Sequence, residues 1–212
     1  NWCKFTYRFF LAVITYFIKD ILNFIQNKDL FFKIIVSSIP VMIIGYILIK
    51  FNLVDQFRNI KVIGWTTIIF GILLYISDKY SITNKIQDNF TYKSAAFIGV
   101  FQILSLIPGV SRSGITITAA RMLKFNRIDS AKISFLLSIP TLGAVSVFGL
   151  KNLVISEDVN FSALNIASIF LSFLFSFVTI KFFLQYIKKF SLKIFVIYRI
   201  ILGIILLIFA YL

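Results

Sequence analysis

Long apolar runs, separated by short charged stretches, constrain this chain more than any other feature. Five runs have close to the roughly 17–25 residues that a helix needs to cross the hydrocarbon core of a bilayer. They cover residues 30–49, 62–77, 133–150, 161–180 and 194–212. Charged residues make up only 14% of the chain, whereas a soluble domain has about 25%. The sequence therefore predicts an all-α polytopic membrane protein with about five transmembrane helices, in a single integral membrane domain over residues 1–212.

The chain is strongly basic, with 22 Lys and Arg residues against 8 Asp and Glu residues and a net charge of +14. In a soluble protein this balance would suggest nucleic-acid binding. Here the basic residues cluster in the loops between apolar runs, as the positive-inside rule describes for membrane proteins. We therefore expect membrane insertion and no nucleic-acid partner.

Residues 94–123 depart from the pattern of full-length runs. The apolar stretch 94–107 is too short to span a bilayer, and Pro108 and Gly109 break it before a second short run at 115–123. Two half-length helices joined by such a turn predict a re-entrant hairpin. Irregular backbone at membrane depth is tolerated only where protein or a wet cavity covers it. We therefore expect the turn to be buried inside the helix bundle.

The residues that follow the turn suit an anion. Ser111 and Ser113 are both good N-cap residues, so a new half-helix is expected to begin at one of them. Its free N–H groups and the positive end of its dipole would point at the turn. Gly114 would let a ligand approach the backbone, and the planar guanidinium of Arg112 can hold two phosphate oxygens at once. The hydroxyl of Thr116 would add a further donor.

Close helix packing could explain the small residues of the turn, because serine and glycine are common at helix contacts in membranes. It does not explain Arg112, since a guanidinium at mid-membrane depth costs about 2.5–3.5 kcal/mol on insertion scales. An anion site is therefore the favoured interpretation. Three other polar residues have open roles: Gln102 faces either the same cavity or the core, Arg199 pairs with either phosphate or a backbone carbonyl, and Arg121 is favoured as an anchor at the membrane boundary over a ligand contact.

Residues 99–116 closely resemble the second signature of the undecaprenyl-diphosphate phosphatases, also called bacitracin-resistance proteins. The segments 135–140 and 143–144 and the pair at 198–199 are similar to that family too. The resemblance implies a multi-pass hydrolase of the bacterial plasma (inner) membrane. Such enzymes remove the terminal phosphate of undecaprenyl diphosphate, which recycles the lipid carrier for cell-wall synthesis and confers bacitracin resistance.

The same resemblance implies a site. It includes catalytic residues at Arg112, Ser113 and Ser111, and substrate phosphate-binding residues at Gly109, Gly114, Thr116, Gln102 and Arg199. It also implies a divalent cation, Mg or Ca, but no metal ligands are identified in this chain. The first signature of the family has two glutamates and a Gly-His pair, whereas this chain has no histidine and a single glutamate, Glu157, in a loop. We therefore expect this chain to be the C-terminal portion of an inverted-repeat fold whose first hairpin precedes Asn1.

One alternative function stays open at this stage. Broken helices that aim their N-termini at an anion are also found in transporters, so the chain could be a polyprenyl-phosphate carrier or flippase that moves its lipid without hydrolysis. The expected partners are a polyprenyl diphosphate lipid and the membrane. A homodimer is one open arrangement.

Overall fold

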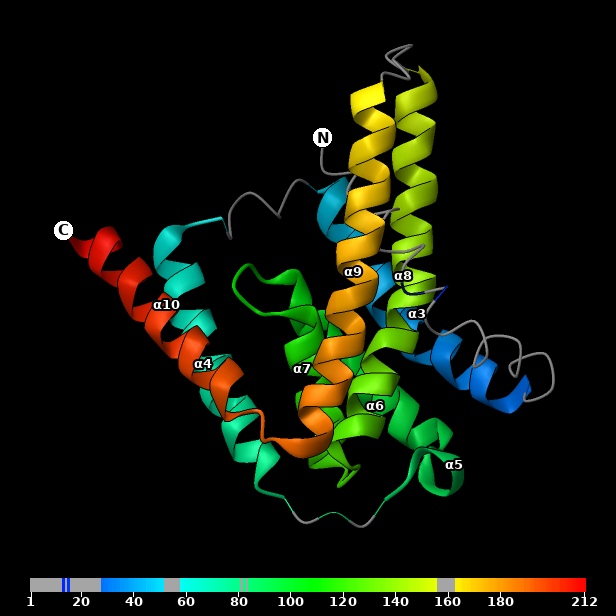
Figure 1. Ribbon diagram of the computed structural model, residues 1–212, viewed down its shortest axis with the longest axis vertical. Helices are drawn as coiled ribbons and strands as arrows, with labels where there is room; N and C mark the ends of the chain where they lie inside the picture. The colour runs from blue at the N-terminus through cyan, green and yellow to red at the C-terminus, as the bar shows by residue number, and fades with distance from the viewer. Residues whose placement is uncertain are drawn as a thin grey trace.

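The computed structural model describes residues 13, 15, 28–51, 58–80, 82, 84–155 and 163–212, although the side chains of residues 87, 88 and 145–169 lie outside the description. Within these ranges the regular secondary structure is helical (Figure 1). The main helices are α3 (Lys28–Lys50), α4 (Ile60–Asp78), α6 (Tyr92–Ile103), α7 (Arg112–Met122), α8 (Arg127–Ile155), α9 (Ala163–Lys189) and α10 (Lys193–Tyr211). Two short helices, α5 (Ile86–Asn89) and η2 (Leu104–Leu106), complete the set. The predicted all-α class is confirmed.

Four of these helices are long and apolar enough to cross a membrane: α3, α4, the segment Phe170–Lys189 of α9, and α10. The remaining predicted run, 133–150, lies within the 29-residue helix α8. Helix α9 continues beyond the predicted end of its apolar run at position 180 and stops only at Lys189. Lysine is a good helix former and no proline or glycine interrupts this stretch, so the helix outlasts the apolar pattern. The chain is a multi-pass membrane protein.

Close helix pairs frame the centre of the molecule. Helix α10 lies along α4 at one side of the view in Figure 1, and α3 packs against α6. A β-carbon built at Gly64 of α4 would come within 2.7 Å of Leu207, and one at Gly99 of α6 would come within 2.5 Å of the Ser37 carbonyl oxygen. The Ser37 hydroxyl donates a hydrogen bond to the Ala95 carbonyl oxygen at 2.6 Å. Glycine and serine therefore permit backbone-to-backbone packing, as expected between membrane helices.

The predicted break in residues 94–123 is confirmed. Helix α6 and the 3-10 turn η2 end before Ile107, and the chain reverses at Pro108 and Gly109 before α7 begins at Arg112. Helix α7 contacts α4, α6 and α8 and lies centrally among them (Figure 1). The two half-length helices have 12 and 11 residues. The start of α7 is therefore placed inside the bundle.

Arg121, near the end of α7, was expected to be an anchor at the membrane boundary, and the structure shows that this prediction is wrong. Its side chain is only 1% exposed. It donates hydrogen bonds to the carbonyl oxygens of Phe125 at 2.6 Å, Asp78 at 2.8 Å and Tyr80 at 2.9 Å. The chain turns back directly after α7, where Lys124 has a φ of 63°. This reversal brings loop carbonyls around the guanidinium, so Arg121 is a structural residue.

The carboxylate of Asp78 joins four parts of the chain. It accepts hydrogen bonds from Arg127 Nε at 2.7 Å and Nη2 at 2.9 Å, at the start of α8. The Leu192 N–H, between α9 and α10, donates to it at 3.3 Å. Arg121 Nε lies 3.5 Å from the same carboxylate. Asp78 therefore holds the ends of α4 and α7 beside α8 and the α9–α10 junction.

We predict that Asp78→Asn strongly lowers the thermal unfolding temperature of the purified protein. The substitution leaves the buried Arg121 guanidinium without its anionic partner, and breaking a buried ion pair in this way costs about 3–5 kcal/mol. Asp29→Asn is a matched control, because Asp29 pairs with Lys33 at an exposed position of α3. Similar unfolding temperatures for the two variants would contradict the role given to Asp78.

Candidate active site at the start of helix α7

A tight turn places the start of α7. The Val110 N–H donates to the Ile107 carbonyl oxygen at 3.2 Å, and Pro108 and Gly109 occupy the two central positions. Gly109 has a φ of +89°, which a type II turn requires at its third position and which glycine adopts without strain. A β-carbon at Gly109 would come within 2.1 Å of Thr66 Oγ1. Glycine is therefore needed for the conformation and for the contact with α4.

The carbonyl groups of the turn find partners on α4 and α10. Thr66 Oγ1 donates to the Pro108 oxygen at 2.7 Å, and Thr67 Oγ1 lies 3.4 Å from the Gly109 oxygen. Arg199 Nη2 donates to the same Gly109 oxygen at 2.9 Å. The two threonines were missed in the sequence, although their position as adjacent polar residues inside an apolar run was a signal. These bonds fix the turn against the α4–α10 pair.

Ser111, not Ser113, is the N-cap of α7. Its backbone is extended, and its hydroxyl oxygen accepts a hydrogen bond from the Gly114 N–H at 3.2 Å. The Ser113 hydroxyl lies 3.3 Å from that of Ser111, and both residues are exposed. The first N–H groups of a helix have no acceptor within it, and the dipole is positive there. Two hydroxyl groups and a helix N-terminus are therefore available together.

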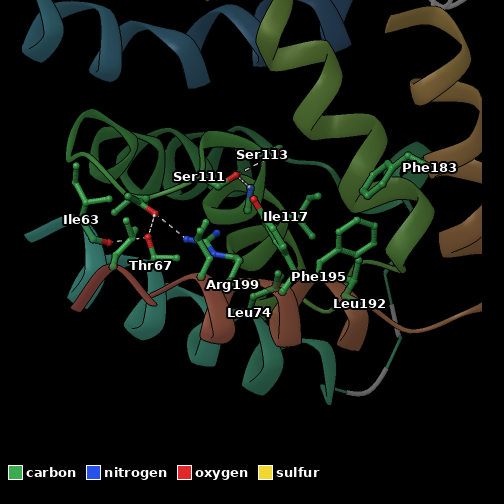
Figure 2. A pocket seen from close by; sticks show the side chains of 16 residues that line it. Ile63, Thr67, Leu74, Ser111, Ser113, Ile117, Phe183, Leu192, Phe195 and Arg199 are labelled. Carbon is green, nitrogen blue, oxygen red and sulfur yellow. Dashed lines mark hydrogen bonds between the residues drawn. The ribbon is translucent and has the colours of Figure 1, made fainter. Parts of the chain in front are cut away.

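Two cavities meet at this first turn of α7. The first, about 470 Å³, lies between α4, α7 and α10, and Figure 2 shows Thr67, Ser111, Ser113 and Arg199 on its walls. The second, about 430 Å³, is bounded by α7, α8 and α9 and is lined by Arg112 and again by Ser113. Phe183 of α9 also lines both. Ser113 is therefore the polar residue of α7 common to both cavities.

Arg112 lines the second cavity, and hydrogen bonds to two neighbouring residues fix its guanidinium. Its Nη2 donates to the Leu137 carbonyl oxygen of α8 at 2.5 Å. With the carboxamide of Gln102 oriented to satisfy both groups, the Gln102 oxygen accepts from Arg112 Nη2 at 3.0 Å and Nε at 3.1 Å. Gln102 is fully buried and lines neither cavity. The structure therefore connects Gln102 to the site through Arg112 and shows no direct opening toward a ligand.

Thr116 lies beside the cavities, whereas Gly114 lines the first one. Thr116 is 1% exposed, and its hydroxyl lies 2.7 Å from that of Ser134 on α8 and 3.0 Å from the Arg112 carbonyl oxygen. It thus faces α8 and lines neither cavity. A β-carbon at Gly114 would lie 2.7 Å from Arg199 Nη1. Gly114 therefore makes room for the guanidinium of Arg199.

Arg199 of α10 is 7% exposed and lines the first cavity. Of the two partners left open by the sequence, the backbone carbonyl is present, because Arg199 Nη2 binds the Gly109 oxygen. Its Nε atom has no hydrogen-bond partner among the described residues. Arg112, at the start of α7, and Arg199, on α10, thus line separate cavities.

Comparison with known proteins identifies the family. The family model described as bacitracin resistance protein BacA matches residues 8–205. The chain belongs to this family. A relative named undecaprenyl-diphosphatase from Pelagibacter ubique (strain HTCC1062) is 52% identical over 202 residues, which are 95% of this chain and 78% of the relative. Relatives of the same name from Jannaschia sp. (strain CCS1) and Saccharophagus degradans (strain 2-40 / ATCC 43961 / DSM 17024) are 38% and 40% identical, over 94% and 91% of this chain and 80% and 76% of theirs. The BacA resemblance seen in the sequence is confirmed.

The divalent cation implied by the resemblance does not fit the described residues. No group of three or more His, Cys, Asp or Glu side chains is found among them. Asp78 is held by Arg127, and Asp129 accepts from Asn126 and the Ile86 N–H. No acidic residue is found on the walls of either cavity within the described part of the chain.

We predict that Gly109→Ala destabilises the fold. The substitution places a side chain in the left-handed region, which costs roughly 1–2 kcal/mol, and drives its β-carbon against Thr66. Gly45→Ala is the matched control, because a β-carbon at Gly45, inside α3, would lie 3.6 Å from Leu106, an ordinary contact. Thermal unfolding of both variants in detergent tests this, and an unfolding temperature of Gly109→Ala at or above that of Gly45→Ala would count against the turn geometry.

Proposed function

We propose that this protein hydrolyses undecaprenyl diphosphate to undecaprenyl phosphate and inorganic phosphate. The observation that carries the proposal is the guanidinium of Arg112, which is fixed by Gln102 and Leu137 and lines a cavity at the N-terminus of α7. The name of the relatives, undecaprenyl-diphosphatase, supports the same reaction. The activity belongs to cell-wall synthesis, in the bacterial inner membrane, and gives resistance to bacitracin.

The chemistry of the step matches what these residues can supply. The oxygen of a water molecule attacks the terminal phosphorus, and the bond between that phosphorus and the bridging oxygen breaks. The lipid monophosphate leaves with the bridging oxygen, and inorganic phosphate is the second product. Most of the catalysis in phosphoryl transfer comes from positioning and from stabilising charge on the transferring oxygens. Preorganised cationic and hydroxyl donors provide both.

Each residue has a role in this scheme. Arg112 binds oxygens of the transferring phosphoryl group through the N–H groups of Nη1, because Nε and Nη2 donate to Gln102 and Leu137. The hydroxyl of Ser113, which lines the same cavity, donates a further hydrogen bond, and that of Ser111 lies 3.3 Å away on the wall of the first cavity as a second donor. The α7 N-terminus adds its positive dipole. We assign Gln102 to holding Arg112 in place. The contacts of Thr116 with Ser134 support a similar indirect role, in which Thr116 fixes α7 against α8.

The cavity next to Arg112 also suits a lipid. Its walls combine the polar side chains of Arg112, Ser113, Ser134 and Ser138 with the apolar ones of Phe135, Leu142, Ile180 and Phe183. A polyprenyl chain can lie against these apolar side chains as it does among lipid tails, while its charged head group meets the cation. A hydrolase and a carrier would share this arrangement, and release of phosphate from purified protein is the property that separates them.

We predict that Arg112→Gln lowers the rate of phosphate release from undecaprenyl diphosphate by about 100-fold to 1,000-fold. Removal of one preorganised donor to transition-state charge costs this much in other enzymes. The assay uses purified full chain in detergent, with membrane insertion checked by fractionation. Lys93→Gln removes one charge at an exposed position of α6 and is expected to keep wild-type turnover. Wild-type turnover by Arg112→Gln would refute the assignment, and lipid binding without phosphate release by the wild-type protein would favour the carrier.

A further inference from the structure

We propose that a groove between α4 and α10, on the side of this helix pair that faces away from α7, binds an anionic phospholipid. The phosphate of the lipid lies at Lys79 and Lys193, and one acyl chain lies along the apolar walls. The groove has a volume of about 320 Å³ and is lined by Ile72, Tyr75, Lys193, Val196, Ile197 and Ile200. This binding is independent of the proposed function, because it can be measured without turnover.

The groove and the candidate active site lie on opposite sides of the helix pair. On α10, Ile197 lines the groove and Arg199 lines the first cavity. On α4, Ile72 lines the groove and Leu74 lines the first cavity. In each helix these residues are two positions apart, and at about 100° per residue their side chains point to opposite faces. Figure 2 shows Leu74 and Arg199 on the side of α7, so the groove faces away from α7.

The apolar walls of the groove are placed to meet lipid. Helices α4 and α10 are both long and apolar enough to cross a membrane. Ile72 is 44% exposed and Ile197 is 56% exposed, whereas Val196 is buried. Exposed apolar side chains of membrane-spanning helices contact lipid tails. The volume of the groove is within the range of ligand pockets, about 300–1,000 Å³, so part of an acyl chain fits into it.

Two lysines lie at one end of the groove, where the two spans end. Helix α4 ends at Asp78 and α10 begins at Lys193. The Leu192 N–H donates to the Asp78 carboxylate at 3.3 Å, which holds these two helix ends together. Lys79 and Lys193 each follow one of these bonded residues in the chain, and both are exposed. The two lysines therefore lie at the same end of the helix pair, at the level of lipid head groups.

Tyr75 connects Lys79 to the groove. Lys79 Nζ lies 4.4 Å from the centre of the Tyr75 ring, and Tyr75 lines the groove. Tyrosine is common at membrane interfaces, because its ring is apolar and its hydroxyl is polar. None of the described residues that line the groove is acidic, and the carboxylate of Asp78 is held by Arg127. The positive charge at this end is therefore left for an anion from outside the chain.

An anionic phospholipid combines the features that the groove recognises. Basic pockets between membrane helices on the cytoplasmic side bind anionic head groups. Lys188 and Lys189, which are exposed near the end of α9, add positive charge close in the chain to Lys193. The positive-inside rule places this end on the cytoplasmic side. A zwitterionic phospholipid has the same acyl chains but no net charge, so the groove selects lipids by the charge of the head group.

The experiment measures lipid binding to the detergent-purified full chain. The increase in unfolding temperature is titrated with phosphatidylglycerol and, separately, with phosphatidylcholine of the same acyl chains, in mixed micelles at constant ionic strength. We expect the wild-type protein to bind phosphatidylglycerol about tenfold or more tightly than phosphatidylcholine. The double variant Lys79→Gln/Lys193→Gln is expected to lose this preference, because each lysine near an anionic lipid surface contributes about fivefold in affinity.

A matched variant separates the groove from a general effect of charge. Lys85→Gln/Lys93→Gln removes the same two charges from exposed positions outside the groove, near α5 and α6. It is expected to keep the wild-type preference for phosphatidylglycerol.

A second variant tests the groove without a change of charge. Ile197→Trp fills the groove and is expected to weaken the binding of phosphatidylglycerol by about tenfold, because the acyl chain loses its place. Ile204→Trp is its control, at an exposed position of the same helix outside the groove. Ile197→Trp decides the question if the double lysine variant does not fold.

Four results would overturn the proposal. The first is equal affinity of the wild-type protein for the two phospholipids. The second is a preference for phosphatidylglycerol that persists in Lys79→Gln/Lys193→Gln, and the third is an equal loss of that preference in Lys85→Gln/Lys93→Gln. The fourth is a wild-type dimer that Ile197→Trp separates, because the groove would then be an interface between two copies of this chain.

Discussion

Backbone polar groups at membrane depth need partners within the protein, and this constraint shapes the whole centre of the molecule. The turn between α6 and α7 exposes the carbonyl groups of Pro108 and Gly109, and side chains from α4 and α10 donate to both. These contacts explain why α10 must lie beside α4 and why both must contact the turn. The helix pair is thus the support that allows a helix to begin inside the bundle.

The buried arginines Arg121 and Arg199 and the half-buried Arg112 differ in how their charge is compensated. Arg121 lies beside the carboxylate of Asp78 and is surrounded by carbonyl groups, so its charge is balanced and its role is structural. Among the described residues, Arg112 and Arg199 are held by neutral oxygens of Leu137, Gln102 and Gly109. Neutral acceptors fix a guanidinium in position while leaving its charge in place. The partners of these arginines therefore separate Arg121, whose charge is balanced by a carboxylate, from Arg112 and Arg199.

The parts of the site that depend on local sequence were predictable. Pro108 and Gly109 stop one helix, and a serine caps the next, because these are effects of residues on their own backbone. The parts that depend on contacts between distant segments were not. Arg121 was expected near the membrane boundary because nothing local shows that the chain reverses at Lys124 and surrounds it with carbonyls. The contact of Gln102 with Arg112 requires the hairpin to be folded before the two side chains can meet.

The glycines at the α4–α10 contact limit which sequence changes α10 can accept. Gly64 and Gly71 lie seven residues apart, about two helical turns, and face Leu207 and Arg199 of α10. Side chains of α10 thus pack against the glycines of α4, and this register sets the position of Arg199 along α4. Insertion or deletion of one residue between positions 199 and 207 would rotate one end of α10 by about 100° relative to the other. Substitutions at the exposed positions of α10 are tolerable on these grounds, whereas insertions and deletions between these two contacts are not.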